Sequence, residues 1–181
     1  MSLAIALTVL TILVAACGGP AASPSPTPAT TASTPTAGTT ASGASGLTPE
    51  ELCNFLLPSD WQQFNYITTV EPEVSSNAPG TAMCGYARAL HFEIYVEDTP
   101  DEAHATYETI IENAPFDAGE PVNIAGSQEA EIDMEITDET SGIVVRTGRI
   151  AFTIGAPAGE EARAQLETLA ETVVQRVASL R

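Results

Sequence analysis

The chain has no lysine, and positive charge is scarce. It has six basic residues against 24 acidic ones, so the formal net charge at pH 7 is -18. A surface of this sign repels a phosphate backbone, and we therefore expect no nucleic-acid partner. It also opposes docking onto anionic lipid head groups. The basic residues are Arg88, Arg146, Arg149, Arg163, Arg176 and Arg181.

Motifs of catalysis and metal binding are also missing. The two histidines, His91 and His104, form no metal-binding pair. There is no Gly-x-Ser-x-Gly sequence for a nucleophile and no glycine-rich phosphate loop. We therefore expect that the protein is not an enzyme and has no cofactor or metal centre.

Charged side chains are absent from the first 46 residues. Residues 3–16 are an apolar run of about 14 residues, which is too short for a transmembrane helix but typical of a signal peptide. The run ends in Val14-Ala15-Ala16-Cys17, which reads as a lipobox. We expect residues 1–16 to be a lipoprotein signal peptide and Cys17 to carry lipid. The alternative is a plain secretory or transmembrane segment in which Cys17 is incidental.

Residues 17–46 continue as a tract rich in Pro, Ser, Thr, Ala and Gly. Such a composition cannot bury enough apolar surface to offset the entropy of ordering, so this tract is predicted to be a disordered stalk. Residues 47–181 are long enough to form a single domain with its own core. The predicted location is the outer face of the cell membrane, with the lipid on Cys17 as the anchor.

Residue patterns within 47–181 predict alternating helices and strands. Thr48 with Glu51, and Thr99 with Glu102, are capping signals for helices that reach Leu57 and residue 114. A third helix is predicted to open at Pro157. This order predicts an α+β fold, an antiparallel sheet packed on one face by helices. The predicted strands cover residues 66–70, 81–89, 90–96, 121–124, 130–136, 143–146 and 150–154.

Cys53 and Cys84 are the cysteines that remain once Cys17 is lipidated. An exported compartment permits disulfides, and we expect these two residues to pair. The bridge would close a loop of about 32 residues and stabilise the fold by roughly 3 to 4 kcal/mol. Two free buried thiols or a metal pair are the alternatives.

Charged residues gather in two places. Four acids recur at every second residue of one predicted strand and are expected on one face, as a solvated surface, a Ca²⁺ site or a docking surface for a basic partner. Arg146 and Arg149 flank a glycine turn, where they could receive an anionic ligand or a partner's carboxylate, or neutralise neighbouring acids across the hairpin. The four acids are Glu129, Glu131, Asp133 and Glu135.

Several of these motifs together resemble a known group of proteins. They are the lipobox and stalk, Leu47–Cys53, Cys84-Gly85-Tyr86, Val144–Ile150 and the closing amphipathic helix. This plan resembles the uncharacterised two-cysteine envelope lipoproteins of actinobacteria, which are similar to the extracellular sensor domain of PknH-type kinases. The resemblance implies an α+β fold with one helix-to-strand disulfide and assigns no activity.

These observations favour a lipid-anchored, extracytoplasmic binding or sensor-like module. Its partner would be an envelope protein or a small-molecule ligand. The alternative is a structural or accessory lipoprotein that acts within an envelope protein assembly. A concave cleft would favour the first hypothesis, and a flat exposed apolar patch would favour the second.

Overall fold

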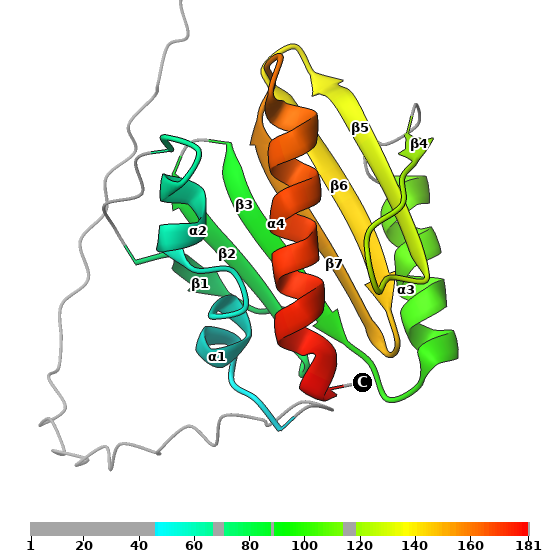
Figure 1. The fold of residues 1–181 in the computed structure, drawn as a ribbon. Helices are drawn as coiled ribbons and strands as arrows, with labels where there is room; N and C mark the ends of the chain where they lie inside the picture. The colour runs from blue at the N-terminus through cyan, green and yellow to red at the C-terminus, as the bar shows by residue number, and fades with distance from the viewer. Residues whose placement is uncertain (1–45, 67–70, 88, 114–118, 181) are drawn as a thin grey trace, which may run out of the picture. The chain divides into compact units, whose positions relative to one another are not determined.

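The computed structural model describes residues 46–66, 71–87, 89–113 and 119–180. The predictions for the signal peptide, Cys17, most of the stalk and a strand over 67–70 lie outside these residues. Figure 1 shows an α+β fold of helices and one sheet. The elements are α1 (Pro49–Cys53), α2 (Pro58–Gln62), β1 (Glu73–Ser75), β2 (Thr81–Ala87), β3 (Leu90–Val96), α3 (Pro100–Asn113), β4 (Glu120–Pro121), β5 (Glu129–Thr137), β6 (Thr140–Thr147), β7 (Ile150–Pro157), α4 (Ala162–Arg176) and the 3-10 turn Val177–Leu180.

The seven strands form one antiparallel sheet in the order β1-β2-β3-β7-β6-β5-β4. The last strand, β7, lies between β3 and β6, and it joins the first half of the domain to the second. The tight turn before it contains Gly148, whose φ of 60° suits a residue without a Cβ. The predicted α+β class and antiparallel sheet are confirmed.

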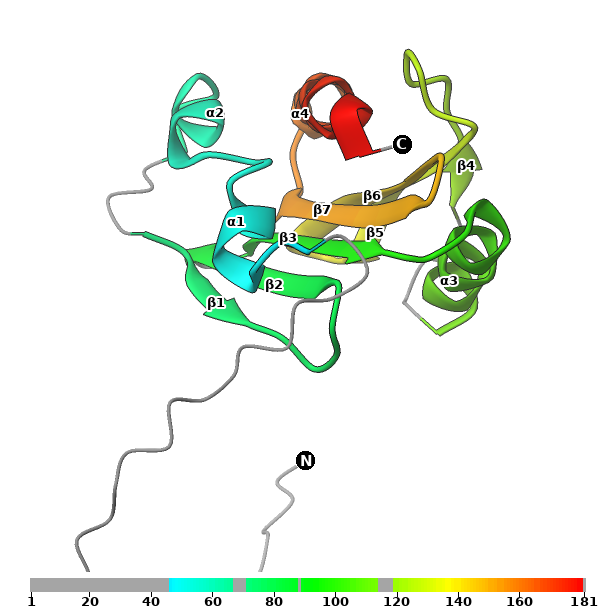
Figure 2. The same cartoon turned by 90° about the horizontal axis from the view of Figure 1, so that it is seen from below.

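Helix α4 covers the main face of the sheet together with α1 and α2 (Figure 2). Its residues at steps of three and four are buried, as their apolar spacing predicts. They pack against alternate residues of the central strands, such as Phe92, Ile143 and Phe152, in one continuous core. This core joins one face of the sheet to α4, and the opposite face of the sheet is free of α4.

Helix α3 packs against that opposite face, although the sequence indicated helices on one face only. Tyr107 of α3 forms a small separate cluster with Val144 and Ala151, which point away from α4. Its start was predicted correctly, because the Thr99 hydroxyl accepts the N–H of Glu102 at 3.2 Å and Glu102 caps the N–H of Thr99 in return. Thr48 and Glu51 form the same capping box at α1.

The disulfide between Cys53 and Cys84 is present and links the end of α1 to β2, as predicted. The two Cα atoms lie 5.8 Å apart, and both residues are buried. Next to the bridge, the hydroxyl of Tyr86 donates to the carbonyl oxygens of Cys53 and Leu56. Helix α1 is therefore attached to the sheet by a covalent bond and by hydrogen bonds.

Two prolines have roles other than those predicted. The first helix ends at Cys53 rather than at Leu57, and Pro58 begins α2 instead of stopping α1. Proline suits a first helical turn as well as a helix end, so the residue type alone leaves both open. Likewise, Pro157 ends β7, and α4 begins only at Ala162.

No helix in the described ranges is long and apolar enough to cross a bilayer.

Candidate functional site

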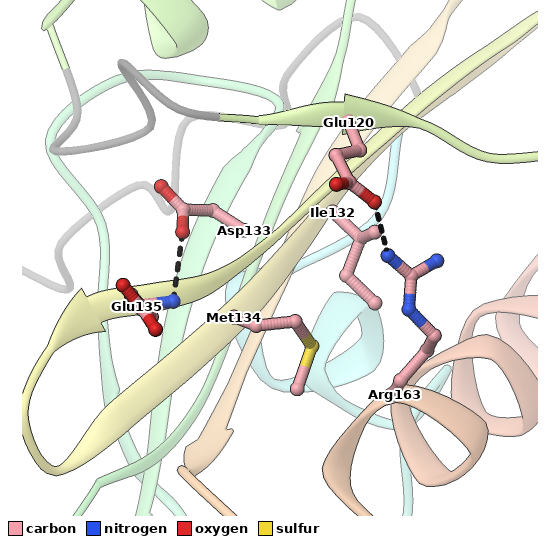
Figure 3. A pocket seen from close by; sticks show the side chains of 6 residues that line it. All are labelled: Glu120, Ile132, Asp133, Met134, Glu135 and Arg163. Carbon is pink, nitrogen blue, oxygen red and sulfur yellow. Dashed lines mark hydrogen bonds and ion pairs between the residues drawn. The ribbon is translucent and has the colours of Figure 1, made fainter.

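A cleft of about 240 Å³ lies where the outer edge of β5 meets β4 and the first turn of α4 (Figure 3). Its lining combines three carboxylates, one guanidinium group and two apolar side chains. The residues are Glu120, Ile132, Asp133, Met134, Glu135 and Arg163. They come from three segments that the fold brings together.

The shortness of β4 exposes this part of β5. Within the described residues, strand β4 pairs with β5 at Glu131 and Ile132, and the Val122 N–H donates to the Ala130 carbonyl oxygen just past Pro121. Beyond that point the β5–β6 register shifts between Asp133 and Thr137. The predicted alternation of β5 changes after this point, since Met134 packs against the core under α4 and Ile136 against the cluster of Tyr107.

Asp133 is the buried carboxylate of the cleft. Only 3% of the residue is exposed, although the alternating pattern predicted it on a solvated acidic face. That expectation is corrected, because Asp133 lies opposite Gly142 and its Oδ1 accepts the N–H of Glu135 at 2.8 Å. Among the described residues Asp133 takes part in no ion pair.

Arg163 of α4 reaches across the cleft to Glu120 of β4 (Figure 3). Their Nη2 and Oε2 atoms lie 2.6 Å apart, and a second nitrogen of Arg163 lies 3.6 Å from Glu167. The Arg163 and Glu120 side chains are 42% and 72% exposed. An ion pair so open to water is weak and can exchange partners.

A second hollow of about 370 Å³ lies over β1, β2 and β3. His91 contributes to its lining, with Glu73 and Glu93 on neighbouring positions. The His91 ring extends over Gly155 of β7, where a Cβ would come within 1.8 Å of its Cε1 atom. Because Gly155 has no side chain, the imidazole ring of His91 can lie directly over it.

Arg146 contacts Glu129, the first of the four regularly spaced acids, next to His104 of α3. The guanidinium Nε of Arg146 and the imidazole Nδ1 of His104 both bond to Oε2 of Glu129, the latter at 3.0 Å. Burial alone would raise the pKa of Glu129, but these hydrogen bonds and the two neighbouring positive groups outweigh it and hold the pKa below its usual value. Burial, with nearby Glu131 and Glu129, raises the pKa of Tyr107. The acid that Arg146 pairs with lies on β5, on the other side of β6 from the Gly148 turn.

Arg149 donates hydrogen bonds to backbone carbonyl oxygens and not to a carboxylate. Its Nε donates to the carbonyl oxygen of Leu180 at 2.8 Å, and its Nη1 to that of Glu97 at 3.3 Å. The structure therefore does not bring Arg146 and Arg149 into one site. An external anion at either residue stays a prediction.

The described ranges contain no group of three or more His, Cys, Asp or Glu side chains that could hold a metal ion. The lipidation residue Cys17 lies outside the described residues. Sequence analysis missed the cleft as a whole, since Glu120, Asp133 and Arg163 are far apart in the chain and carry no shared motif.

Comparisons of the chain with protein-family models, with curated proteins and with solved structures found no match.

Proposed function

We propose that the protein is a lipid-anchored, extracytoplasmic binding module whose ligand occupies the cleft between β5, β4 and α4. The observation that carries the binding role is Asp133, a buried carboxylate in the wall of this cleft. Burying a charge is costly unless a counter-charge offsets it. A buried acidic residue that lines a cleft and forms no ion pair among the described residues supports a binding role there.

The anchoring part of the proposal rests on the sequence. An apolar run of signal-peptide length ends in Val14-Ala15-Ala16-Cys17, and a charge-free Pro/Ser/Thr tract follows at once. This arrangement would place residues 47–181 outside the membrane, on a stalk of about 29 residues. The partner would then be an envelope protein or a small molecule of that compartment.

The anchor is tested by producing the full chain in a bacterium that processes lipoproteins and growing the cells with a clickable palmitate analogue. We expect label on the wild type, in the membrane fraction, and none on Cys17→Ala. A labelled C17A protein, or an unlabelled wild type, would contradict the assignment of Cys17. Cys53→Ala and Cys84→Ala together serve as the control, since these cysteines form the disulfide.

The binding role is tested by native mass spectrometry of the full-length protein, released from membranes in nonionic detergent. We expect a reproducible added mass on the wild type that is lost or weakened in Asp133→Asn. Glu112→Gln is the matched control, because Glu112 is exposed on α3 and does not line the cleft. An added mass retained by D133N would place the ligand elsewhere, and a bare wild type would argue against a tightly held ligand.

A second candidate function is that of an accessory lipoprotein that acts within an envelope assembly. The 370 Å³ hollow over β1, β2 and β3 is a second surface at which a protein partner could be sought. Photo-crosslinking in cells separates the two functions. A cross-linker at Met83 would capture a protein neighbour in an assembly, whereas one at Glu135 would report on the cleft.

A further inference from the structure

We propose that His104 makes the attachment of α3 to the sheet depend on pH, so that the helix is held more firmly when both nitrogens of the imidazole ring carry a proton. His104 of α3 lies beside Glu129 of β5, which is also bonded to Arg146 of β6. The inference concerns the face of the sheet opposite α4 and does not depend on a ligand in the cleft.

Both ring nitrogens of His104 face a carboxylate. Nδ1 lies 3.0 Å from Oε2 of Glu129, and Nε2 lies 3.4 Å from Oε1 of Glu108, four residues further along the helix. An ionised carboxylate accepts hydrogen bonds and donates none, and a neutral imidazole has a single N–H. In the neutral ring one nitrogen therefore turns a lone pair towards a carboxylate oxygen. The imidazolium ion, in contrast, donates to both carboxylates.

The charges around His104 favour the same protonated form. Glu108 and Glu129 are two carboxylates, and the guanidinium of Arg146 balances only one of them. A proton on His104 balances the other. The remaining ionisable groups on the face of the sheet that α3 covers are all acidic, and their charge acts in the same direction. They are Glu131 of β5, Glu93 and Tyr95 of β3, and Glu97, which accepts a hydrogen bond from Thr106 of α3, while β7 has no ionisable side chain.

Few apolar contacts hold α3, so a contribution from charge is noticeable there. Ala103 and Tyr107 are its buried residues, whereas α4 buries a row of residues along its whole length. Tyr107 packs with Val144 and Ala151 in a cluster separate from the main core. A local opening of α3 therefore needs less free energy than an opening of α4. The His104 side chain is 45% exposed, which gives protons from the solvent access to the ring.

The direction of the effect follows from the form of the ring that makes both bonds. Histidine exchanges its proton with water between about pH 5 and 8, a range in which carboxylates are mostly ionised. Because the imidazolium form joins Glu108 to Glu129, the additional hold on α3 is present at the acid end of this range and is lost as the pH rises. Detachment of α3 would uncover the apolar side chains of Val144 and Ala151.

The test is hydrogen–deuterium exchange of the full-length protein in nonionic detergent, followed by mass spectrometry of its peptides. Exchange is compared at about pH 5.5 and about pH 8, after correction for the intrinsic exchange rate at each pH. We expect the protection of α3 in the wild type to be about threefold lower at the higher pH. Peptides from α4 are the internal control, and their protection should change less.

Three variants identify the group that titrates. His104→Gln keeps a hydrogen-bond donor without a charge that depends on pH, and its α3 should be equally protected at both pH values. His91→Gln is the matched control, because His91 is exposed and lies over Gly155 of β7, and it should respond as the wild type does. Glu108→Gln removes one of the two carboxylates and should reduce the response. It also keeps the test usable if H104Q does not fold.

Several results would overturn the proposal. Equal protection of α3 at both pH values in the wild type would show that the proton does not hold the helix. An equal fall in wild type and H104Q, or loss of the response in H91Q, would place the titrating group elsewhere. An unchanged response in E108Q would contradict the bridge between two carboxylates. A fall of the same size in α3 and α4 would mean that pH acts on the whole domain.

Discussion

Two arginines each pair with a carboxylate, but in different surroundings. Arg176 forms a two-pronged bond to Asp60, with Nη2 and Oδ1 2.9 Å apart, and also donates to the carbonyl oxygen of Phe55 at 3.0 Å. The Asp60 side chain is only 12% exposed. The Arg163 pair at the cleft, in contrast, is open to solvent. The two ion pairs therefore differ in how much they contribute to stability.

We expect Arg176→Ala to lower the free energy of unfolding by about 2 kcal/mol, because it removes the counter-charge of a mostly buried carboxylate, to which only the Leu57 N–H would still donate, and the Arg176 donor to the Phe55 carbonyl. Arg163→Ala is the matched control, and it should cost less than about 1 kcal/mol. Urea denaturation followed by circular dichroism measures both. Equal losses would show that burial does not separate the two pairs.

The position of His91 over Gly155 yields a second prediction at the level of single residues. A Cβ at 155 would collide with the imidazole ring, yet His91 is exposed and its ring can swing away. Gly155→Ala should therefore lower the free energy of unfolding by less than about 1 kcal/mol. The double variant with His91→Ala should recover the loss in the same urea titration. A loss of several kcal/mol in G155A would mean that neighbouring groups fix the ring.

At the scale of elements, α3 is attached to the sheet through charge as well as through apolar contacts. Glu129 of β5 accepts from His104 of α3 and from Arg146 of β6, and these contacts lower its pKa. A carboxyl whose pKa is lower in the folded state stabilises the fold above its unfolded pKa of about 4.3. The contribution is lost as the pH falls through the folded value.

Glu129→Gln should consequently be less stable than the wild type near neutral pH, and the difference should shrink as the pH falls below about 4. Urea titrations at a series of pH values measure the difference. Glu112→Gln, on the exposed side of α3, should show no such trend. A difference that stayed constant down to pH 2 would show that Glu129 acts through its shape and not its charge.

The helices and strands also show which parts of the fold could be predicted from the sequence and which could not. Capping at Thr48 and Thr99 was predicted because its partners lie three residues away. Alternation placed Leu90–Val96 correctly, because every second residue of that strand is buried in the core. The burial of Asp133 was not predicted, because strand alternation assigns a residue to a face of the sheet but does not show what covers that face. The side of the sheet that α3 occupies depends on contacts with β6 and β7, which only the complete fold supplies.

At the scale of the molecule, the disulfide ties the first helix to a sheet that is otherwise built from later residues. Cys53 and Cys84 are 31 residues apart, so the bridge limits the freedom of the unfolded chain. Replacing both with alanine should lower the free energy of unfolding by about 3 to 4 kcal/mol. Urea titration measures this loss, and treatment of the wild type with reductant under unfolding conditions should reproduce it. No loss would mean that the unfolded chain is already restricted.

The two ends of the sheet have a consequence for the behaviour of many copies together. An open strand edge can recruit a strand from a neighbouring molecule and so begin aggregation. Here β1 has three residues, β4 has two, and Pro121 removes an N–H from the outer edge. Where β4 ends, the register shift and the exposed charge of Glu135 protect β5. With a net charge of -18 keeping copies apart, the domain is suited to crowding at high density without forming fibrils.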